Sequence, residues 1–101
     1  MKVAMVRYKT KPDRAGENQR LIENVFRELQ QMSPEGLHYA SFKLGDGVSF
    51  VHIAAIEAAD GHNPLTQSVA FKAFTADIKD RCEEPPVATD LTQIGSYRFF
   101  G

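Results

Sequence analysis

The chain contains no tryptophan and one cysteine among its 101 residues. Because a single cysteine, Cys82, cannot form an internal disulfide, we expect a reducing compartment, the cytoplasm. Cys82 itself is expected to be a small apolar residue near a helix end. No apolar run approaches the roughly 20 residues that a membrane span needs. The N-terminal segment MKVAMVRYKTK is too short and too alternating for a signal peptide, so we expect no membrane partner.

The chain also lacks an excess of charge of either sign, since its formal net charge is −1. That balance does not predict a nucleic-acid or membrane-surface partner. The apolar fraction of 43 % and the charged fraction of 25 % are ordinary for a globular protein. The length predicts a single domain, residues 1–101. A domain this small often gains stability by forming oligomers.

The first half of the chain predicts a strand followed by a helix. Residues 2–9, KVAMVRYK, are rich in β-branched and aromatic side chains and predict a strand that ends before Pro12. Asp13 is expected to be the N-cap of the next element. Residues 17–32 carry apolar side chains at the helical period of 3.6 residues, with a polar opposite face. The apolar positions are Leu21, Ile22, Val25, Phe26, Leu29 and Met32.

Two further strands, residues 37–44 and 48–57, are joined by the segment GDG and predict a hairpin. If these three residues form the whole connection, Leu44 lies opposite Val48. Alternation along the strands then places one set of residues on a common face. A two-residue loop would shift this register by one. The set consists of His38, Ala40, Phe42, Phe50, His52 and Ala54.

The segment HNPLTQSVAFKAFTADI has two apolar stripes of different phase, which predicts a break between two helical pieces. Asn63 is the expected N-cap of a short first turn that begins at Pro64. Ser68 is the expected cap of a longer helix over residues 69–82. EEPP then predicts a rigid connector, and residues 91–100 predict a last strand with a bulge at Gly95.

The order β-α-β-β-α-β is that of the ferredoxin-like folds, in the α+β class. Right-handed crossovers then give a four-stranded antiparallel sheet with both helices on one face. The opposite face should be polar in a monomer, yet both alternating sets of the central strands are apolar. An apolar sheet face of this size needs a partner. We therefore predict a homodimer with the sheets packed face to face, a dimeric α/β barrel. The apolar sets are Val3 and Met5 against Ala4, Val6 and Tyr8, and Val51, Ile53 and Ala55 against Phe50, Ala54 and Ile56.

The run SVAFKAF resembles the S/T-x-x-F-x-x-F run in the second helix of antibiotic-biosynthesis-monooxygenase-like domains, in the dimeric α/β-barrel superfamily. The resemblance covers nearly the whole chain in length and element order. It implies a cleft between the sheet and the helices of each protomer, and a last strand that reaches toward the partner. Haem-degrading and quinone-forming members use an Asn, a Trp and a His, and the corresponding positions are Val6, Ile56 and Leu65. Haem degradation is therefore not expected, and no cofactor is expected.

The resemblance and the predicted register together define candidate site residues. If Val6 and Ile56 face the cleft, so do Tyr8, Phe50 and His52, and the predicted register adds His38 and Phe42. His38 and His52 are the candidate catalytic residues, because an imidazole in an apolar cleft can act as a general base or bind a phenolic hydroxyl. In the alternative interpretation each histidine bonds a backbone group or faces solvent. The candidate ligand-binding residues are Tyr8, Phe42, Phe50 and Phe71.

Other sites are not predicted by this sequence. Two histidines without a third ligand do not make a metal site. His62 is expected to have no specific role. Tyr97 and Arg98 could reach into a cleft or brace the dimer, and we favour bracing because only one of two adjacent strand residues can face the cleft. Arg7 is expected to face the dimer interface.

We consider three functions. The first is a homodimer that binds a small apolar or aromatic molecule, with cofactor-independent oxidation or isomerisation as the reaction if it is an enzyme. The second is a non-catalytic member that senses a ligand or serves assembly. The third is RNA binding, because RNA-recognition domains share the element order. DGVSFVHI, however, matches only the Gly, the central Phe and the Val of their signature.

Overall fold

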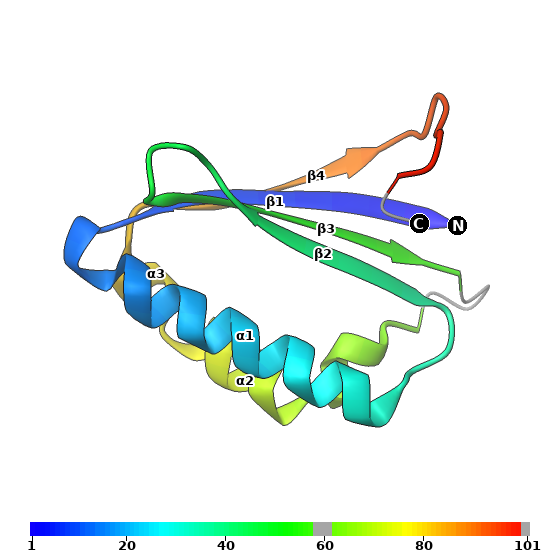
Figure 1. Ribbon diagram of the computed structural model, residues 1–101, viewed down its shortest axis with the longest axis horizontal. Coiled ribbons are helices and arrows are strands. Elements are labelled where there is room, and N and C mark those ends of the chain that lie inside the picture. The colour runs from blue at the N-terminus through cyan, green and yellow to red at the C-terminus, as the bar shows by residue number, and fades with distance from the viewer. Residues whose placement is uncertain (58–61, 100–101) are drawn as a thin grey trace.

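The computed structural model describes residues 1–57 and 62–99. It shows one antiparallel sheet with the helices of these residues packed on one of its faces (Figure 1). The strand order is β2-β3-β1-β4, so the predicted ferredoxin-like α+β fold is confirmed. The elements are β1 (Lys2–Thr10), a 3₁₀ turn (Pro12–Arg14), α1 (Ala15–Met32), β2 (Leu37–Lys43), β3 (Ser49–Ile56), a second 3₁₀ turn (Pro64–Gln67), α2 (Val69–Ala76), α3 (Ile78–Arg81) and β4 (Cys82–Leu91).

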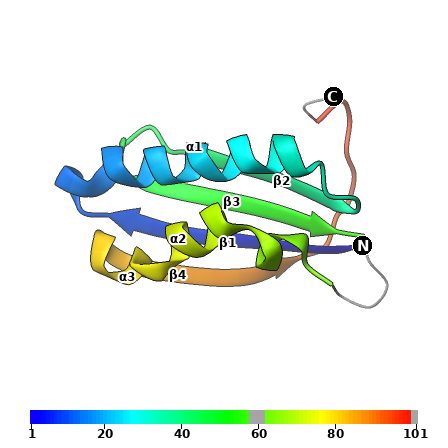
Figure 2. The same cartoon turned by 90° about the horizontal axis from the view of Figure 1, so that it is seen from below.

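The helices divide the covered face of the sheet between them. Figure 2 shows α1 over the β2–β3 side, and α2 with α3 over the β1–β4 side. Within the described residues, no helix is both long enough and apolar enough to cross a bilayer. The core between the two layers is formed by Tyr8, Ile22, Val25, Leu29, Phe50, Leu65, Phe74 and Cys82.

The start of α1 differs from the prediction. Asp13 lies inside the 3₁₀ turn, and the N-cap position of α1 is Arg14, which has no side-chain capping bond. The turn runs directly into the helix, because the Arg14 amide already bonds the Lys11 carbonyl at 2.9 Å. The Asp13 cap was therefore wrong, whereas the amphipathic helix itself is confirmed.

The predicted break in the second helical region is confirmed. The Asn63 side chain accepts the amide of Leu65, and the Ser68 hydroxyl accepts the amide of Phe71 at 2.9 Å. Glu28 reaches across from α1 and accepts the Ser68 hydroxyl together with the first amides of α2. A carboxylate at a helix N-terminus satisfies donors that have no partner inside the helix. The expected single helix over residues 69–82 is interrupted once more, at Asp77, before α3.

The hairpin loop is one residue longer than predicted, which changes the register. The Leu44 amide bonds the Ser49 carbonyl at 2.9 Å, so the loop beyond this last pair consists of the four residues 45–48. The Val48 carbonyl instead accepts the Thr10 amide of β1 at 2.8 Å. The Asp46 carboxylate holds this loop through the amides of Val48 and Ser49. As a result Tyr39 lies opposite Ala54, and Ser41 lies opposite His52.

The last strand lies earlier in the chain than predicted. β4 spans Cys82–Leu91 and contains Pro85 and Pro86, so EEPP is part of a strand and is not a connector. Proline is tolerated there because β4 is an edge strand and its pairing with β1 shifts between Arg7 and Lys9. Residues 92–99 form no helix or strand and leave on the side of the sheet away from the helices (Figure 1).

The sheet face away from the helices is called here the outer face. The registers align Met5 with Ile53 and Ala40 there, and Arg7 with Val51 and Phe42. The predicted apolar character of both sheet faces is thus confirmed. Cys82 is buried at the junction of α3 and β4, and burial raises the pKa of its thiol, as expected for an unreactive apolar residue.

The Ser68 cap gives a stability prediction. We expect Ser68→Ala to lower the free energy of unfolding by about 1–2 kcal/mol, because the Phe71 amide and the Glu28 carboxylate both lose a buried partner. Urea denaturation at equilibrium measures the change. Ser96→Ala is the control, since Ser96 is exposed in the C-terminal segment. Its effect should stay within about 0.5 kcal/mol, and equal losses in the two variants would contradict the capping role.

Candidate functional site

A cavity of about 510 Å³ lies between the inner face of the sheet and the second helical region. We call it the central cavity. Its lining is mostly aliphatic and aromatic, with four aromatic rings and one imidazole among the side chains. The residues are Lys2, Ala4, Val6, Tyr8, Tyr39, His52, Ala54, Ile56, Asn63, Leu65, Phe71, Phe74, Thr75, Ile78 and Pro86, among which the aromatic rings of Tyr8, Tyr39, Phe71 and Phe74 surround the His52 imidazole.

Three of the six predicted site residues line the central cavity: Tyr8, His52 and Phe71. Phe50 is buried in the core and stacks on the Tyr8 ring with centroids 5.6 Å apart, so it supports the cavity wall without forming it.

The structure places the other two predicted residues elsewhere. His38 lies opposite Ala55 and Phe42 opposite Val51, on the sheet face away from His52. The His38 side chain is 65 % exposed and lies 3.5 Å from the Glu57 carboxylate. The predicted placement of His38 on the same sheet face as His52 was therefore wrong, because it rested on a three-residue loop.

The hydrogen bonds of His52 lead in two directions. On one side the Tyr8 hydroxyl lies 2.7 Å from Nε2. On the other side the Tyr39 hydroxyl lies 2.8 Å from Nδ1 and the Ser41 hydroxyl lies 2.7 Å from it. Both imidazole nitrogens are thus engaged, and the ring is only 5 % exposed.

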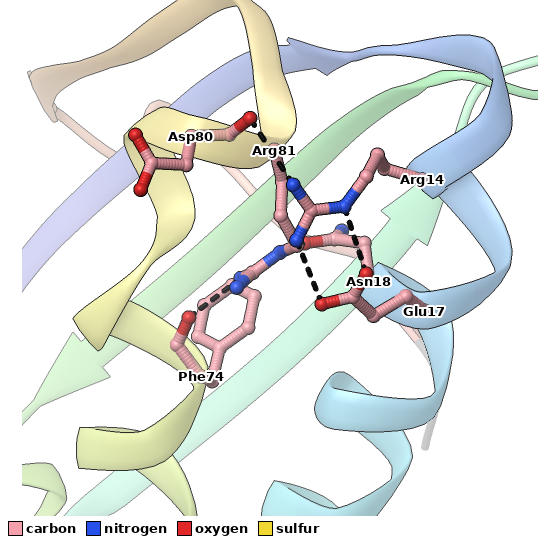
Figure 3. Close-up of polar contacts among 6 residues, drawn as sticks. All are labelled: Arg14, Glu17, Asn18, Phe74, Asp80 and Arg81. Atoms are coloured by element: carbon pink, nitrogen blue, oxygen red, sulfur yellow. Dashed lines mark hydrogen bonds and ion pairs between the residues drawn. The ribbon is translucent and has the colours of Figure 1, made fainter.

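The chain of hydrogen bonds continues from Tyr8 to a buried arginine. Asn18 donates its amide Nδ2 to the Tyr8 hydroxyl at 2.9 Å, and Arg81 donates Nε to Asn18 Oδ1 at 3.1 Å. Figure 3 shows the Arg81 guanidinium between Asn18 and Phe74, where Nη2 donates to the Phe74 carbonyl at 2.6 Å. We call the chain that runs from Arg81 through Asn18, Tyr8 and His52 to Tyr39 and Ser41 the relay.

Four of the relay residues were not singled out from the sequence. Tyr39 and Ser41 would have followed from a register shifted by one. For Asn18 the sequence does hold a signal, because this residue lies at the head of the apolar stripe that continues through Ile22 and Val25. The structure shows it fully buried there. Arg81 has none, since a lone arginine at a helix end is usually exposed.

Burial keeps the imidazole and the two phenol groups of the site neutral around pH 7. It lowers the pKa of His52 to about 4 and raises the pKa of Tyr39 to about 12. Burial also raises the pKa of Tyr8, and the hydrogen bond from Asn18 opposes that effect only in part. The site therefore offers hydroxyl and imidazole groups in their uncharged forms.

Stacked rings hold the imidazole in place. The His52 ring lies 5.4 Å from the Tyr8 ring, 5.9 Å from the Tyr39 ring and 5.3 Å from the Phe74 ring, measured between centroids. Within residues 1–57 and 62–99, no group of three or more His, Cys, Asp or Glu side chains could hold a metal ion.

Comparisons with known proteins support the fold. No protein-family model matches the chain, and no curated protein matches it. An antibiotic biosynthesis monooxygenase-like structure from Nitrosomonas europaea has a TM-score of 0.75 at 14 % identity, covering 94 % of this chain and 100 % of its own. Rv0793 from Mycobacterium tuberculosis has a TM-score of 0.72 at 17 % identity, covering 95 % and 98 %. A monooxygenase-like structure from Caulobacter crescentus has a TM-score of 0.71 at 16 % identity, covering 93 % and 90 %.

At these sequence identities the structural similarity shows the fold alone. The resemblance to antibiotic-biosynthesis-monooxygenase-like domains is confirmed at that level. Val6, Ile56 and Leu65, the positions that the resemblance placed at the cleft, all line the central cavity. Their side chains are aliphatic, so the cavity of this chain differs chemically from one built on Asn, Trp and His.

The lowered pKa of His52 predicts a pH dependence of stability. Between about pH 4 and pH 6.5 the unfolded chain binds a proton at this residue that the folded chain does not. The free energy of unfolding therefore falls as the pH is lowered through this window, by roughly 3 kcal/mol in total from this residue. Thermal denaturation of wild type and His52→Gln from pH 7 to pH 4.5 isolates the contribution. Parallel curves for the two proteins would show that His52 is not held neutral by folding.

Proposed function

We propose that the protein is a homodimer in which each protomer binds one small, largely apolar or aromatic molecule in its central cavity. The observation that carries the proposal is a neutral, buried His52 at the wall of an otherwise apolar cavity. We place the protein in the cytoplasm, because its one cysteine is unpaired.

The size and the lining of the central cavity fit a small ligand. Its volume of about 510 Å³ lies inside the range of roughly 300–1,000 Å³ that is typical of ligand pockets. Phe71 and Phe74 offer aromatic faces, while Val6 and Leu65 offer aliphatic ones. Lys2 is the one charged side chain among the described residues of the lining, so an uncharged ligand fits best.

An open cavity favours ligand binding over a role in assembly alone. A purely structural barrel would be expected to fill this space with its phenylalanines. Here Phe42 lies on the outer face and Phe50 lies outside the lining, so neither blocks the cavity. The non-catalytic alternative, a ligand sensor, uses the same cavity.

If the protein is an enzyme, His52 and Tyr39 are the groups that would move a proton. Both nitrogens of His52 are hydrogen-bonded, so the imidazole acts on a ligand through the Tyr39 hydroxyl. Proton transfer of this kind suits a cofactor-independent isomerisation or oxidation. His38 is not included, because it lies on the other face of the sheet.

The outer face supports the dimer. Met5, Ile53 and Val51 form apolar rows there that the protomer does not cover with its helices. On the same side, the C-terminal segment holds Ile94 at 97 % exposure and Tyr97 at 84 % exposure. Packing two outer faces together buries the rows, at a gain of about 25 cal/mol per Å² before association costs.

RNA binding is not supported. Phe50 is the one aromatic residue that matches the RNA-recognition signature, and base stacking would require it on the open face of the sheet. It is 2 % exposed and packs beneath the helices. A nucleotide base therefore has no access to its ring.

The dimer gives a prediction about assembly. Sedimentation velocity at micromolar concentration should show a particle with the mass of two chains. Ile53→Lys should convert it to a monomer, because it places an ammonium group in the centre of the outer face. Val69→Lys is the matched control, since Val69 is 72 % exposed on the helical side. A wild-type monomer, or equal behaviour of the two variants, would rule out this interface.

The central cavity gives a prediction about binding. We expect 2-naphthol to bind saturably and to shift the amide resonances of Tyr39 and His52 in NMR spectra. Ala54→Leu should weaken binding roughly tenfold or more, because the larger side chain occupies the cavity. Ala73→Leu is the control on the exposed side of α2. Unchanged affinity in Ala54→Leu would place the binding site elsewhere.

A further inference from the structure

The relay has a direction that begins at Arg81. A guanidinium can only donate hydrogen bonds. Arg81 is 1 % exposed and donates to Asn18 Oδ1 and to the Phe74 carbonyl. The Asn18 amide must therefore turn its oxygen toward Arg81 and its NH₂ group toward Tyr8, so the orientation of this amide follows from its neighbours.

The direction passes through Tyr8 to His52. The Tyr8 hydroxyl oxygen accepts a hydrogen bond from Asn18, so its own hydrogen goes to its other partner, His52 Nε2. Nε2 is then the bare nitrogen of the imidazole. Because the ring is neutral, its proton is on Nδ1.

At Nδ1 the relay reaches two hydroxyl groups, Tyr39 and Ser41. The protonated nitrogen donates to one of them. Nδ1 cannot accept a hydrogen from either group. The Tyr39 and Ser41 hydroxyls therefore each keep a hydrogen that the imidazole does not take. Of the two side chains, Tyr39 lines the central cavity and Ser41 does not.

We propose that Tyr39 presents this hydrogen to the central cavity and binds an acceptor oxygen of the ligand, which makes aromatic ketones and quinones the preferred class. Arg81 and Asn18 are positioning residues, because they set the direction of the relay without touching the ligand. The inference about ligand class rests on the proposed binding function of the cavity. A site built to donate a hydrogen bond discriminates against an isostere that lacks the acceptor.

The direction of the relay can be measured without any ligand. Protonated and bare imidazole nitrogens differ widely in ¹⁵N chemical shift, so NMR of ¹⁵N-histidine-labelled protein identifies the tautomer of His52. We expect the proton on Nδ1 in the wild type. A proton on Nε2 would overturn the inference.

Asn18→Asp should reverse the relay. A carboxylate beside Arg81 has no hydrogen to give Tyr8, so the Tyr8 hydroxyl donates to residue 18 and His52 Nε2 donates to Tyr8. The imidazole proton then moves from Nδ1 to Nε2. Asn24→Asp is the matched control, because Asn24 is exposed on the same helix and also accepts from an arginine, Arg27. It should leave the His52 spectrum unchanged. An unchanged tautomer in Asn18→Asp would overturn the positioning role, and if that variant does not fold, the wild-type tautomer still decides the direction.

The ligand class is tested with an isosteric pair, 2-acetylnaphthalene and 2-isopropenylnaphthalene, which differ in a carbonyl against a methylene. We expect the ketone to bind the wild type roughly three- to tenfold more tightly. Asn18→Asp should abolish the preference, and Asn24→Asp should keep it. Equal affinities in the wild type would overturn the ligand class but leave the proposed function intact. Failure of both compounds to bind would refute the proposed function, while the tautomer would still decide the direction of the relay.

Discussion

The constraint on which the structure depends is a positive charge buried among three helices of the fold. Arg81 comes from the short helix α3, and its guanidinium bonds Asn18 of α1 and the carbonyl of Phe74 in α2. It also lies over the Phe74 ring, 5.4 Å from the centroid. Removing a charge from water costs several kcal/mol unless polar partners replace the water. The neutral partners accept hydrogen bonds from the cation, which can only donate. This fixes the orientation of the Asn18 amide, and through it the direction of the hydrogen bonds at Tyr8 and His52.

The central cavity follows from the way in which the second helical region is interrupted. A continuous helix would lay side chains along the whole sheet, whereas the break at Ser68 turns the chain and begins a short α2. Glu28 fixes that start from the facing helix, and the hydrogen bonds it accepts lower its pKa. Small residues on the strands beneath, such as Ala54, leave space that the short helix does not fill. The central cavity is thus a consequence of capping chemistry as much as of the apolar residues that line it.

The sequence predicted those features that depend on neighbours along the chain. The break and cap at Ser68 follow from local periodicity and capping preference, and the apolar outer face follows from alternation along single strands. The register of the hairpin depends on where Val48 pairs, and its partner is in β1, far away in sequence. Because the loop is one residue longer than predicted, Tyr39 lies at the cavity in place of His38. The bond from Arg81 joins residues 63 positions apart, and no local pattern encodes it.

Strand β3 serves both proposed functions through its alternation. Its even positions, His52 and Ala54, face the central cavity, whereas Ile53 between them faces the outer side. Packing of a second chain against Ile53 would restrict the backbone that also positions His52, because adjacent residues share peptide planes. The imidazole makes hydrogen bonds of 2.7 and 2.8 Å to partners on two other strands, so a small shift of β3 would break them. In the proposed dimer, packing at Ile53 and the order of the relay would therefore be linked through β3, and a monomeric variant that keeps its fold is expected to bind a ligand less selectively.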